Sequence, residues 1–162
     1  MRIVLFIMTT LILPSCLSTA KLSDLPKTAD DINFDAYAKG ITQNAKGIWT
    51  FKTSTEYYLE TSIPMTRETL VKIIKQALYT RNYKVNPFVT AADNRITASH
   101  GMSVNEWSYV TGVYFKISPE KAQIYIRTKI TQDITGGVKN NLSEKLGMII
   151  ETYIRQSVSQ KG

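Results

Sequence analysis

Residues 107–134, WSYVTGVYFKISPEKAQIYIRTKITQDI, decide the fold of this chain. They contain two runs rich in β-branched and aromatic residues, 107–117 and 122–134, on either side of the turn Ser118-Pro119-Glu120-Lys121. Such runs around a short turn are typical of an antiparallel β-hairpin. We therefore predict two paired strands at these positions.

The side chains of the hairpin determine its register. When Ile117 is paired with Ala122, nearly all side chains on one face are apolar, whereas a slip of one residue would mix the two faces. We expect the apolar face to pack against helices. The opposite face, which we expect to meet solvent or a partner, carries Tyr114, Lys116, Tyr125, Arg127 and Lys129, with Gly112 leaving room for the Arg127 guanidinium.

Two amphipathic helices are predicted from apolar residues that recur at helical spacing. The first follows Thr66, a predicted N-cap, and ends near Asn82. The second begins at Leu142 and ends near Val158. Both carry polar side chains on the face opposite the apolar stripe, so each needs a sheet or another helix to cover one side.

Further strands are predicted at 48–63, which is typical of a long strand or a bent strand pair, and at 83–89 and 95–98. The resulting order β-α-β-β-β-α predicts an α+β two-layer sandwich. In this fold, an antiparallel sheet of about four strands carries both helices on one face.

The first residues predict an export signal. Met1-Arg2 precedes an apolar run to Leu13 that is too short to span a membrane. The only cysteine of the chain follows this run, in Leu13-Pro14-Ser15-Cys16. This stretch resembles a bacterial lipobox, although Pro14 is not the usual residue at its position. The resemblance implies removal of residues 1–15 as a signal peptide and lipidation of the Cys16 thiol.

Two other interpretations remain open. Ser18-Thr19-Ala20 resembles the site of an ordinary signal peptidase, which would release a soluble product that begins at Lys21. Alternatively, Cys16 is a chance residue in a removed signal peptide. We favour lipidation because a lone cysteine has no disulfide partner in an oxidising compartment. In a Gram-negative host, Leu17 resembles the signals that send lipoproteins to the outer membrane, where the domain would face the periplasm.

Residues 16–46 are predicted to form the lipidated N-terminus and a flexible tether, before a single globular domain at 47–158. Residues 17–33 are small and polar and show no periodicity. A linker of this length would let the domain stand about 20–25 Å from the lipid surface. Phe34, Tyr37 and Ala38 predict one short amphipathic turn of helix.

The chain carries a formal net charge of +7, and residues 48–162 contain 15 Lys and Arg against 9 Asp and Glu. A basic domain near a membrane suits anionic partners such as an acidic glycan, a lipid head group or an acidic envelope protein. The same charge would also simply keep the domain soluble. Export separates the protein from nucleic acid, which we therefore exclude as a partner.

Little in the sequence points to catalysis or to a cofactor. His100 is the only histidine, and a triad with Ser99, Ser103 and Glu106 would require neighbours in one loop to adopt the geometry of a nucleophile site. No G-x-S-x-G elbow supports such a site. One histidine and one cysteine cannot form a zinc cluster, and no phosphate loop is present. We therefore predict no metal and no cofactor.

The order of the elements also supports a resemblance. The run GIWTFKTSTEYYLETSIPMTRETLVKIIKQAL at 47–78, DNRITA at 93–98, the hairpin and the final helix resemble small uncharacterised bacterial envelope lipoproteins. The resemblance covers about residues 47–156 and implies no catalytic residues. We expect a non-enzymatic lipoprotein that acts as an anchored interaction or accessory domain and has an envelope protein as partner.

Two alternatives to this function follow from the same residues. The first is a protein that binds an anionic envelope polymer or lipid through the basic, tyrosine-containing face of the hairpin. The second, which we favour less, is a hydrolase that uses the loop around His100.

Overall fold

The computed structural model describes residues 20–40, 42–45, 48–52, 56–85, 94–101, 108–130 and 141–159. The predicted signal peptide at 1–15 and the predicted lipidation site at Cys16 lie outside these residues.

Strands and helices of the described residues follow in the order expected from the sequence, with additions at the N-terminal side. The strands are β1 (Thr42–Ala45), β2 (Ile48–Lys52), β3 (Glu56–Thr61), β4 (Lys84–Val85), β5 (Arg95–His100), β6 (Tyr109–Ile117) and β7 (Ala122–Ile130). The α-helices are α1 (Phe34–Ala38), α2 (Arg67–Thr80) and α3 (Leu142–Ser159). Two 3₁₀ turns, η1 (Leu22–Asp24) and η2 (Ala29–Asp31), precede them.

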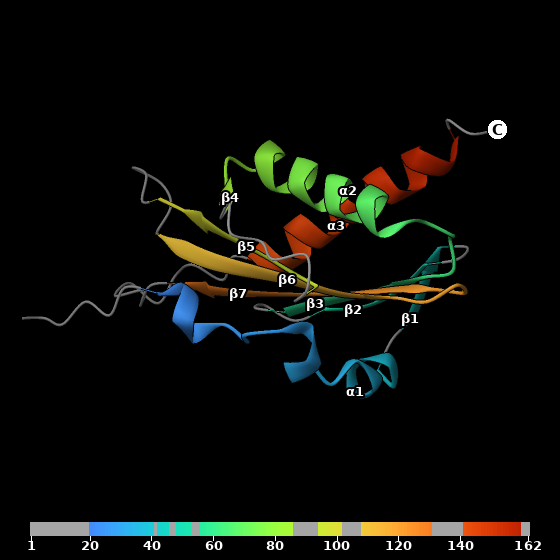
Figure 1. Cartoon of the computed structure of the whole chain (residues 1–162), viewed down its shortest axis with the longest axis horizontal. Coiled ribbons are helices and arrows are strands. Elements are labelled where there is room, and N and C mark those ends of the chain that lie inside the picture. The colour runs from blue at the N-terminus through green and yellow to red at the C-terminus, as the bar shows by residue number, and fades with distance from the viewer. Residues whose placement is uncertain are drawn as a thin grey trace, which may run out of the picture.

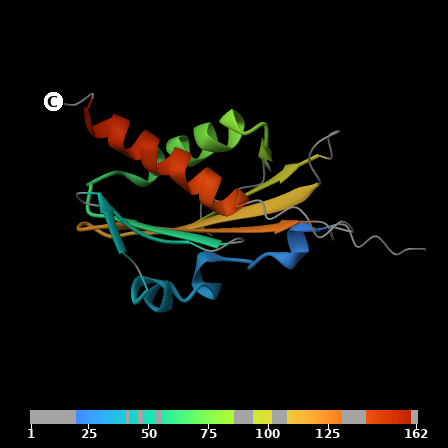
Figure 2. The same ribbon diagram turned by 180° about the vertical axis from the view of Figure 1, so that it is seen from behind.

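The strands form one antiparallel sheet in the order β1-β2-β3-β7-β6-β5-β4. Helices α2 and α3 lie together on one face of this sheet, and the chain from η1 to α1 runs along the other face (Figures 1 and 2). The predicted α+β fold, with an antiparallel sheet that carries two helices on one face, is confirmed. The sheet has seven described strands where about four were predicted. One reason is that the segment 48–63 divides into β2 and β3.

The β6–β7 hairpin has the predicted register. Ile117 is paired with Ala122, Phe115 with Ile124, and Tyr109 with Ile130. The odd-numbered side chains of β6 point to α2 and α3, as expected. The even-numbered residues from Val110 to Tyr114 are covered as well, because every residue from Tyr109 to Phe115 is buried, and only Lys116 is exposed in this strand.

Helix α2 begins and ends at the signals that the sequence contains. Thr66 is the N-cap, and its hydroxyl accepts a hydrogen bond of 3.2 Å from the backbone N–H of Thr69. At the C-terminus Asn82 has a φ of 56°, and the N–H groups of Asn82 and Tyr83 donate to the carbonyls of Tyr79 and Leu78. This is a Schellman motif, in which asparagine tolerates the left-handed conformation after the last turn.

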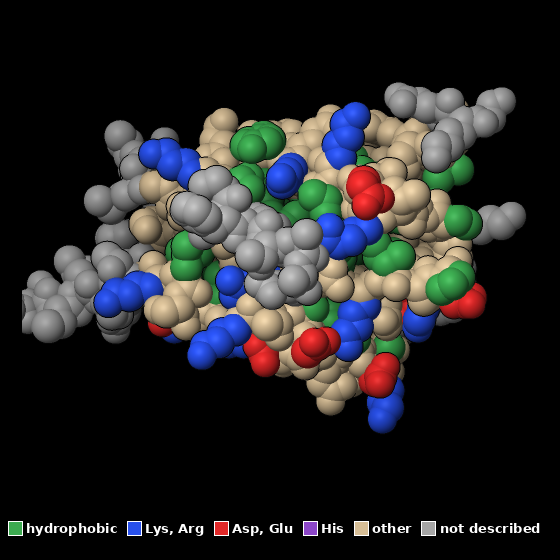
Figure 3. Space-filling view, viewed as in Figure 1, with side chains coloured by type: hydrophobic (Ala, Val, Ile, Leu, Met, Phe, Trp, Pro, Cys, Tyr) green, Lys and Arg blue, Asp and Glu red, His purple; other side chains and the backbone are tan. Residues whose placement is uncertain are grey.

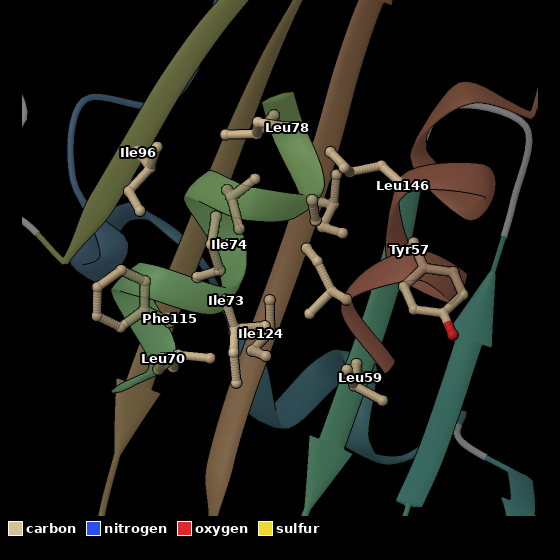
Figure 4. Packing of buried hydrophobic residues seen from close by; sticks show 14 of the residues in the cluster. Tyr57, Leu59, Leu70, Ile73, Ile74, Leu78, Ile96, Phe115, Ile124 and Leu146 are labelled. Atoms are coloured by element: carbon tan, nitrogen blue, oxygen red, sulfur yellow. The ribbon is translucent and has the colours of Figure 1, made fainter. Parts of the chain in front are cut away.

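The main core lies between the sheet and the two helices. Ile73, Ile74 and Leu78 of α2 point towards the sheet, and Leu146 of α3 lies beside Tyr57 of β3 (Figure 4). The Tyr57 hydroxyl donates to Glu151 of α3 over 3.0 Å, and Glu151 also pairs with Arg155. The one buried carboxylate of this helix is therefore satisfied by a hydroxyl and a guanidinium.

The N-terminal segment, defined here as residues 20–40, covers the second face of the sheet. Its apolar side chains Leu25, Ala29, Ile32 and Phe34 are each at most 7% exposed. The prediction of a flexible tether over 16–46 is therefore wrong for the described residues 20–40. The predicted helical turn is confirmed as α1, where Asn33 caps the helix by accepting from the N–H of Ala36. Helix and turns form here because the apolar side chains can pack on the sheet.

Gly147 of α3 permits the closest approach between helix and sheet. A Cβ at this position would lie 2.2–2.6 Å from three ring carbons of Tyr57, which is itself fully buried. We expect Gly147→Ala to lower the free energy of unfolding by about 2–3 kcal/mol because overpacking forces ring or helix to shift. Urea unfolding followed by circular dichroism measures the change.

The matched control is Gly101→Ala, where a Cβ would meet nothing within 4 Å. We expect it to change the free energy of unfolding by less than about 0.5 kcal/mol. Equal stability of the two variants would show that α3 does not approach Tyr57 this closely.

Candidate functional site

The candidate site is the sheet face opposite α2 and α3, which we call the tyrosine face. Three tyrosines form one row across its central strands, because Tyr58 of β3 is paired with Tyr125 of β7, and Tyr125 with Tyr114 of β6. All three are at most 1% exposed. The row is therefore a buried layer between the sheet and the N-terminal segment.

Aromatic contacts hold α1 on this row. The ring of Tyr37 lies 4.6 Å from that of Tyr125 and is stacked at 6.1 Å on that of Tyr58. Phe34 meets Tyr58 edge-on at 6.3 Å. Such offset and edge-to-face arrangements are the favourable ones for aromatic pairs.

Tyr114 binds the backbone of the N-terminal segment. Its hydroxyl donates to the carbonyl of Pro26 over 2.7 Å, and Arg95 of β5 donates to the same oxygen over 2.9 Å. The Tyr114 ring lies across Gly112, where a Cβ would be 2.6 Å from the ring. Gly112 therefore makes room for Tyr114, and not for the guanidinium of Arg127 as predicted.

Two glutamates of β3 organise the hydroxyl groups. Glu56 accepts from Tyr125 at 2.9 Å and from Tyr37 at 3.2 Å. Glu60 accepts from Tyr58 at 2.8 Å and from the Gln123 amide at 3.1 Å, and Lys121 lies 3.3 Å away. Neither role was predicted from the sequence, although the E-x-x-x-E spacing places both carboxylates on one face of the strand, on either side of Tyr58.

The basic residues of the predicted site lie around the edge of the N-terminal segment. Lys116 lies 5.2 Å from the centre of the Phe34 ring, a cation–π distance. Lys129 pairs with Asp24 at 3.3 Å. Arg127, two residues before Lys129 in β7, is also exposed.

The prediction of an open face is therefore wrong for Tyr114 and Tyr125, which the N-terminal segment covers. Lys116, Arg127 and Lys129 remain exposed. The structure brings all five residues to one face, as the register predicted, but it does not leave their aromatic part available to a ligand. A ligand for the tyrosines would first have to displace residues 20–40.

Burial dominates the electrostatics of this face. It raises the pKa of Tyr58, Tyr114 and Tyr125 well above the ordinary value for a phenol, and the neighbouring Glu56 and Glu60 add to the shift for Tyr125 and Tyr58. At the edge, the backbone N–H of Lys21 and then the Lys129 ammonium lower the pKa of the Asp24 carboxyl. The face therefore holds neutral phenols in its centre and ionised pairs at its border.

Only His100 and Ser99 of the disfavoured triad lie among the described residues. The His100 ring is stacked on Tyr109 at 4.7 Å and meets Tyr83 edge-on at 6.0 Å, on the helix side of the sheet. Ser99 precedes it in β5 and therefore points to the opposite face. Ser103 and Glu106 lie outside the described residues. No cluster of metal ligands occurs among the residues that the structure describes.

Comparisons with known proteins give no assignment. No family model matches the chain, and a search of curated proteins finds no match. Among solved structures, a conserved protein of unknown function from Enterococcus faecalis, EF2215, is 9% identical, with 78% of this chain and 95% of that chain covered and a TM-score of 0.27. This score is too low to establish a common fold. Within the described ranges, no helix has the length and apolar character needed to cross a bilayer.

The packing of Phe34 predicts how firmly the N-terminal segment is held. We expect Phe34→Ala to speed hydrogen exchange of the amides at 32–39 by roughly tenfold or more, because the lost ring removes a large buried contact. Asp35→Ala, at the exposed neighbouring position, is the matched control and should change the rates by less than about twofold. Mass-spectrometric hydrogen exchange measures both. Fast exchange already in the unaltered protein would contradict the packing.

The raised pKa values of Tyr58, Tyr114 and Tyr125 predict alkaline instability. Because the fold favours their neutral form, its contribution to stability is complete below pH of about 10 and is lost as pH rises further. We expect tyrosinate absorbance of these rings to rise only together with the loss of sheet circular dichroism. Titration of all tyrosines near pH 10 with unchanged circular dichroism would contradict the burial.

Proposed function

We propose that the protein is a non-enzymatic envelope lipoprotein, anchored through Cys16, whose α+β domain acts by binding an envelope protein. The observation that carries the proposal is the lipobox-like Leu13-Pro14-Ser15-Cys16, which ends an apolar run and contains the only cysteine of the chain. This arrangement suits export, cleavage and lipidation.

The packing of the N-terminal segment supports the anchoring role. Lys21 donates its backbone N–H to Asp24, and the chain is packed on the sheet from Leu25 onwards. The domain therefore begins only a few residues after Cys16. A lipid at Cys16 would hold the whole fold at the membrane, where a partner in the same membrane is met at high local concentration.

The His100 ring packs against Tyr83 and Tyr109, so aromatic packing accounts for this side chain without a catalytic role. Binding of an anionic polymer through the tyrosine face is the weaker alternative, because Tyr114 and Tyr125 are buried under residues 20–40. The exposed basic residues at the border of this face are still able to contact anions.

Intact-mass spectrometry of the protein from the membrane fraction tests the anchor. We expect a chain that begins at Cys16 and carries a diacylglyceryl group, and we expect a Cys16→Ser variant to lose both the lipid and the membrane association. The serine variant is nearly isosteric, so that changes in folding do not obscure the result. A chain that begins at Lys21 in the soluble fraction would contradict the proposal.

A further inference from the structure

The start of the N-terminal segment is fixed beside one end of the sheet. The Asp24 carboxylate accepts from the backbone N–H of Lys21 over 3.1 Å and pairs with Lys129, the penultimate residue of β7, at 3.3 Å. From there the segment runs towards the β6–β7 turn, and the described chain starts at the opposite end of the molecule from that turn (Figure 1). One end of the sheet therefore lies next to the start of the N-terminal segment, and the other end, at the β6–β7 turn, lies far from it.

The length of chain between Cys16 and Ala20 limits how far this end can be from a lipid on Cys16. Four residue steps span at most about 14 Å when fully extended. Residues 21–24 are exposed but are held at the sheet by the turn η1 and by the Asp24–Lys129 pair, and the chain is packed on the sheet from Leu25 onwards, so the described residues add little to this reach. A lipid on Cys16 therefore keeps the end of the sheet at Lys129 close to the head groups, instead of leaving the domain free at 20–25 Å as a tether would.

The charge of this end suits an anionic surface. Lys84, Ser99, Val110 and Lys129 form one row across β4, β5, β6 and β7, so that two lysines lie at the same end of the sheet. Lys21 joins them in the chain before η1, and Asp24 opposes them. In the first turn of α3, the opposite charges of Glu144 and Lys145 cancel. A space-filling view shows Lys and Arg side chains at this end (Figure 3).

The opposite end carries charges of both signs. Near the β6–β7 turn, Glu120 and Glu60 are accompanied by Lys121, which pairs with Glu60, and by Lys116, which shares Gln123 with Glu60 as a register partner. We call the end with Lys21, Lys84 and Lys129 the anchored end and the other the turn end. The connection to Cys16 at the anchored end sets the orientation of the domain, and the lysines of that end suit anionic head groups.

We propose that the docked N-terminal segment holds the anchored end against anionic phospholipid head groups and points the turn end away from the membrane. This inference rests on the lipid anchor proposed above. Its consequence is that the turn end and the C-terminal half of α3 are the parts presented to a partner at a distance from the bilayer.

Fluorescence quenching in reconstituted vesicles tests the orientation. Because Cys16 is the only cysteine, a cysteine introduced elsewhere accepts a fluorophore alone once the Cys16 thiol is lipidated. Labels are placed at the anchored end with Leu22→Cys or Asn141→Cys, and at the turn end with Glu120→Cys. The vesicles contain phosphatidylcholine and phosphatidylglycerol, with a nitroxide on the head group as quencher.

We expect quenching to be several-fold stronger for the labels at positions 22 and 141 than for the label at 120. Combining each label with Phe34→Ala should reduce this difference, because a released segment no longer fixes the orientation. Equal quenching at both ends, or stronger quenching at position 120, would overturn the proposal. If the lipid anchor were absent, the protein would not float with the vesicles in a density gradient, which would contradict the proposed function and not the orientation alone.

A second arm tests the role of charge. On the Asn141→Cys background, Lys84→Glu should lower the quenching at least twofold in vesicles with phosphatidylglycerol, while Lys72→Glu on the exposed face of α2 should leave it unchanged. Both positions are exposed and both variants change the net charge equally. The same response to both substitutions would show that the anchored end has no specific contact with anionic lipid.

Discussion

The β6–β7 hairpin carries large buried side chains on both of its faces, and the rest of the structure follows from the need to cover both. Phe115, Ile124 and their neighbours face α2 and α3, while Tyr114 and Tyr125 face the other way and are equally buried. An antiparallel sheet ordinarily leaves one face to water. Here the two helices cover one face and the N-terminal segment covers the other, so that removal of either cover would expose large aromatic or aliphatic surface.

This double cover links the proposed anchor to the fold. The N-terminal segment is both the connection to Cys16 and a structural layer, since Pro26 accepts from Tyr114 and Arg95, and Tyr37 contacts Tyr125. A chain with this arrangement holds its domain at a fixed place relative to a lipid on Cys16. The tyrosine face is thereby a structural element, and recognition of partners falls to surfaces that remain exposed.

Local sequence signals predicted much of this fold. Strand alternation gave the register of the hairpin, and Thr66 and Asn82 marked the ends of α2. The N-terminal segment escaped prediction because its polar residues lack periodicity and its apolar ones, from Leu25 to Phe34, are separated by irregular turns. One signal was available: the run Tyr109 to Phe115 is nearly continuously apolar, which is typical of a strand buried on both faces. The roles of Glu56 and Glu60 depend on contacts between distant segments, which no local pattern contains.

The most direct test of the double cover is ¹⁵N relaxation on the processed chain with Cys16→Ser, which reports the mobility of each amide in solution. We expect order parameters of about 0.85 for Leu25 to Tyr37, equal to those of β6 and β7. Values below about 0.6 for these residues, with a rigid sheet, would contradict it, because the N-terminal segment would then be a mobile tether and the tyrosine face open to ligands.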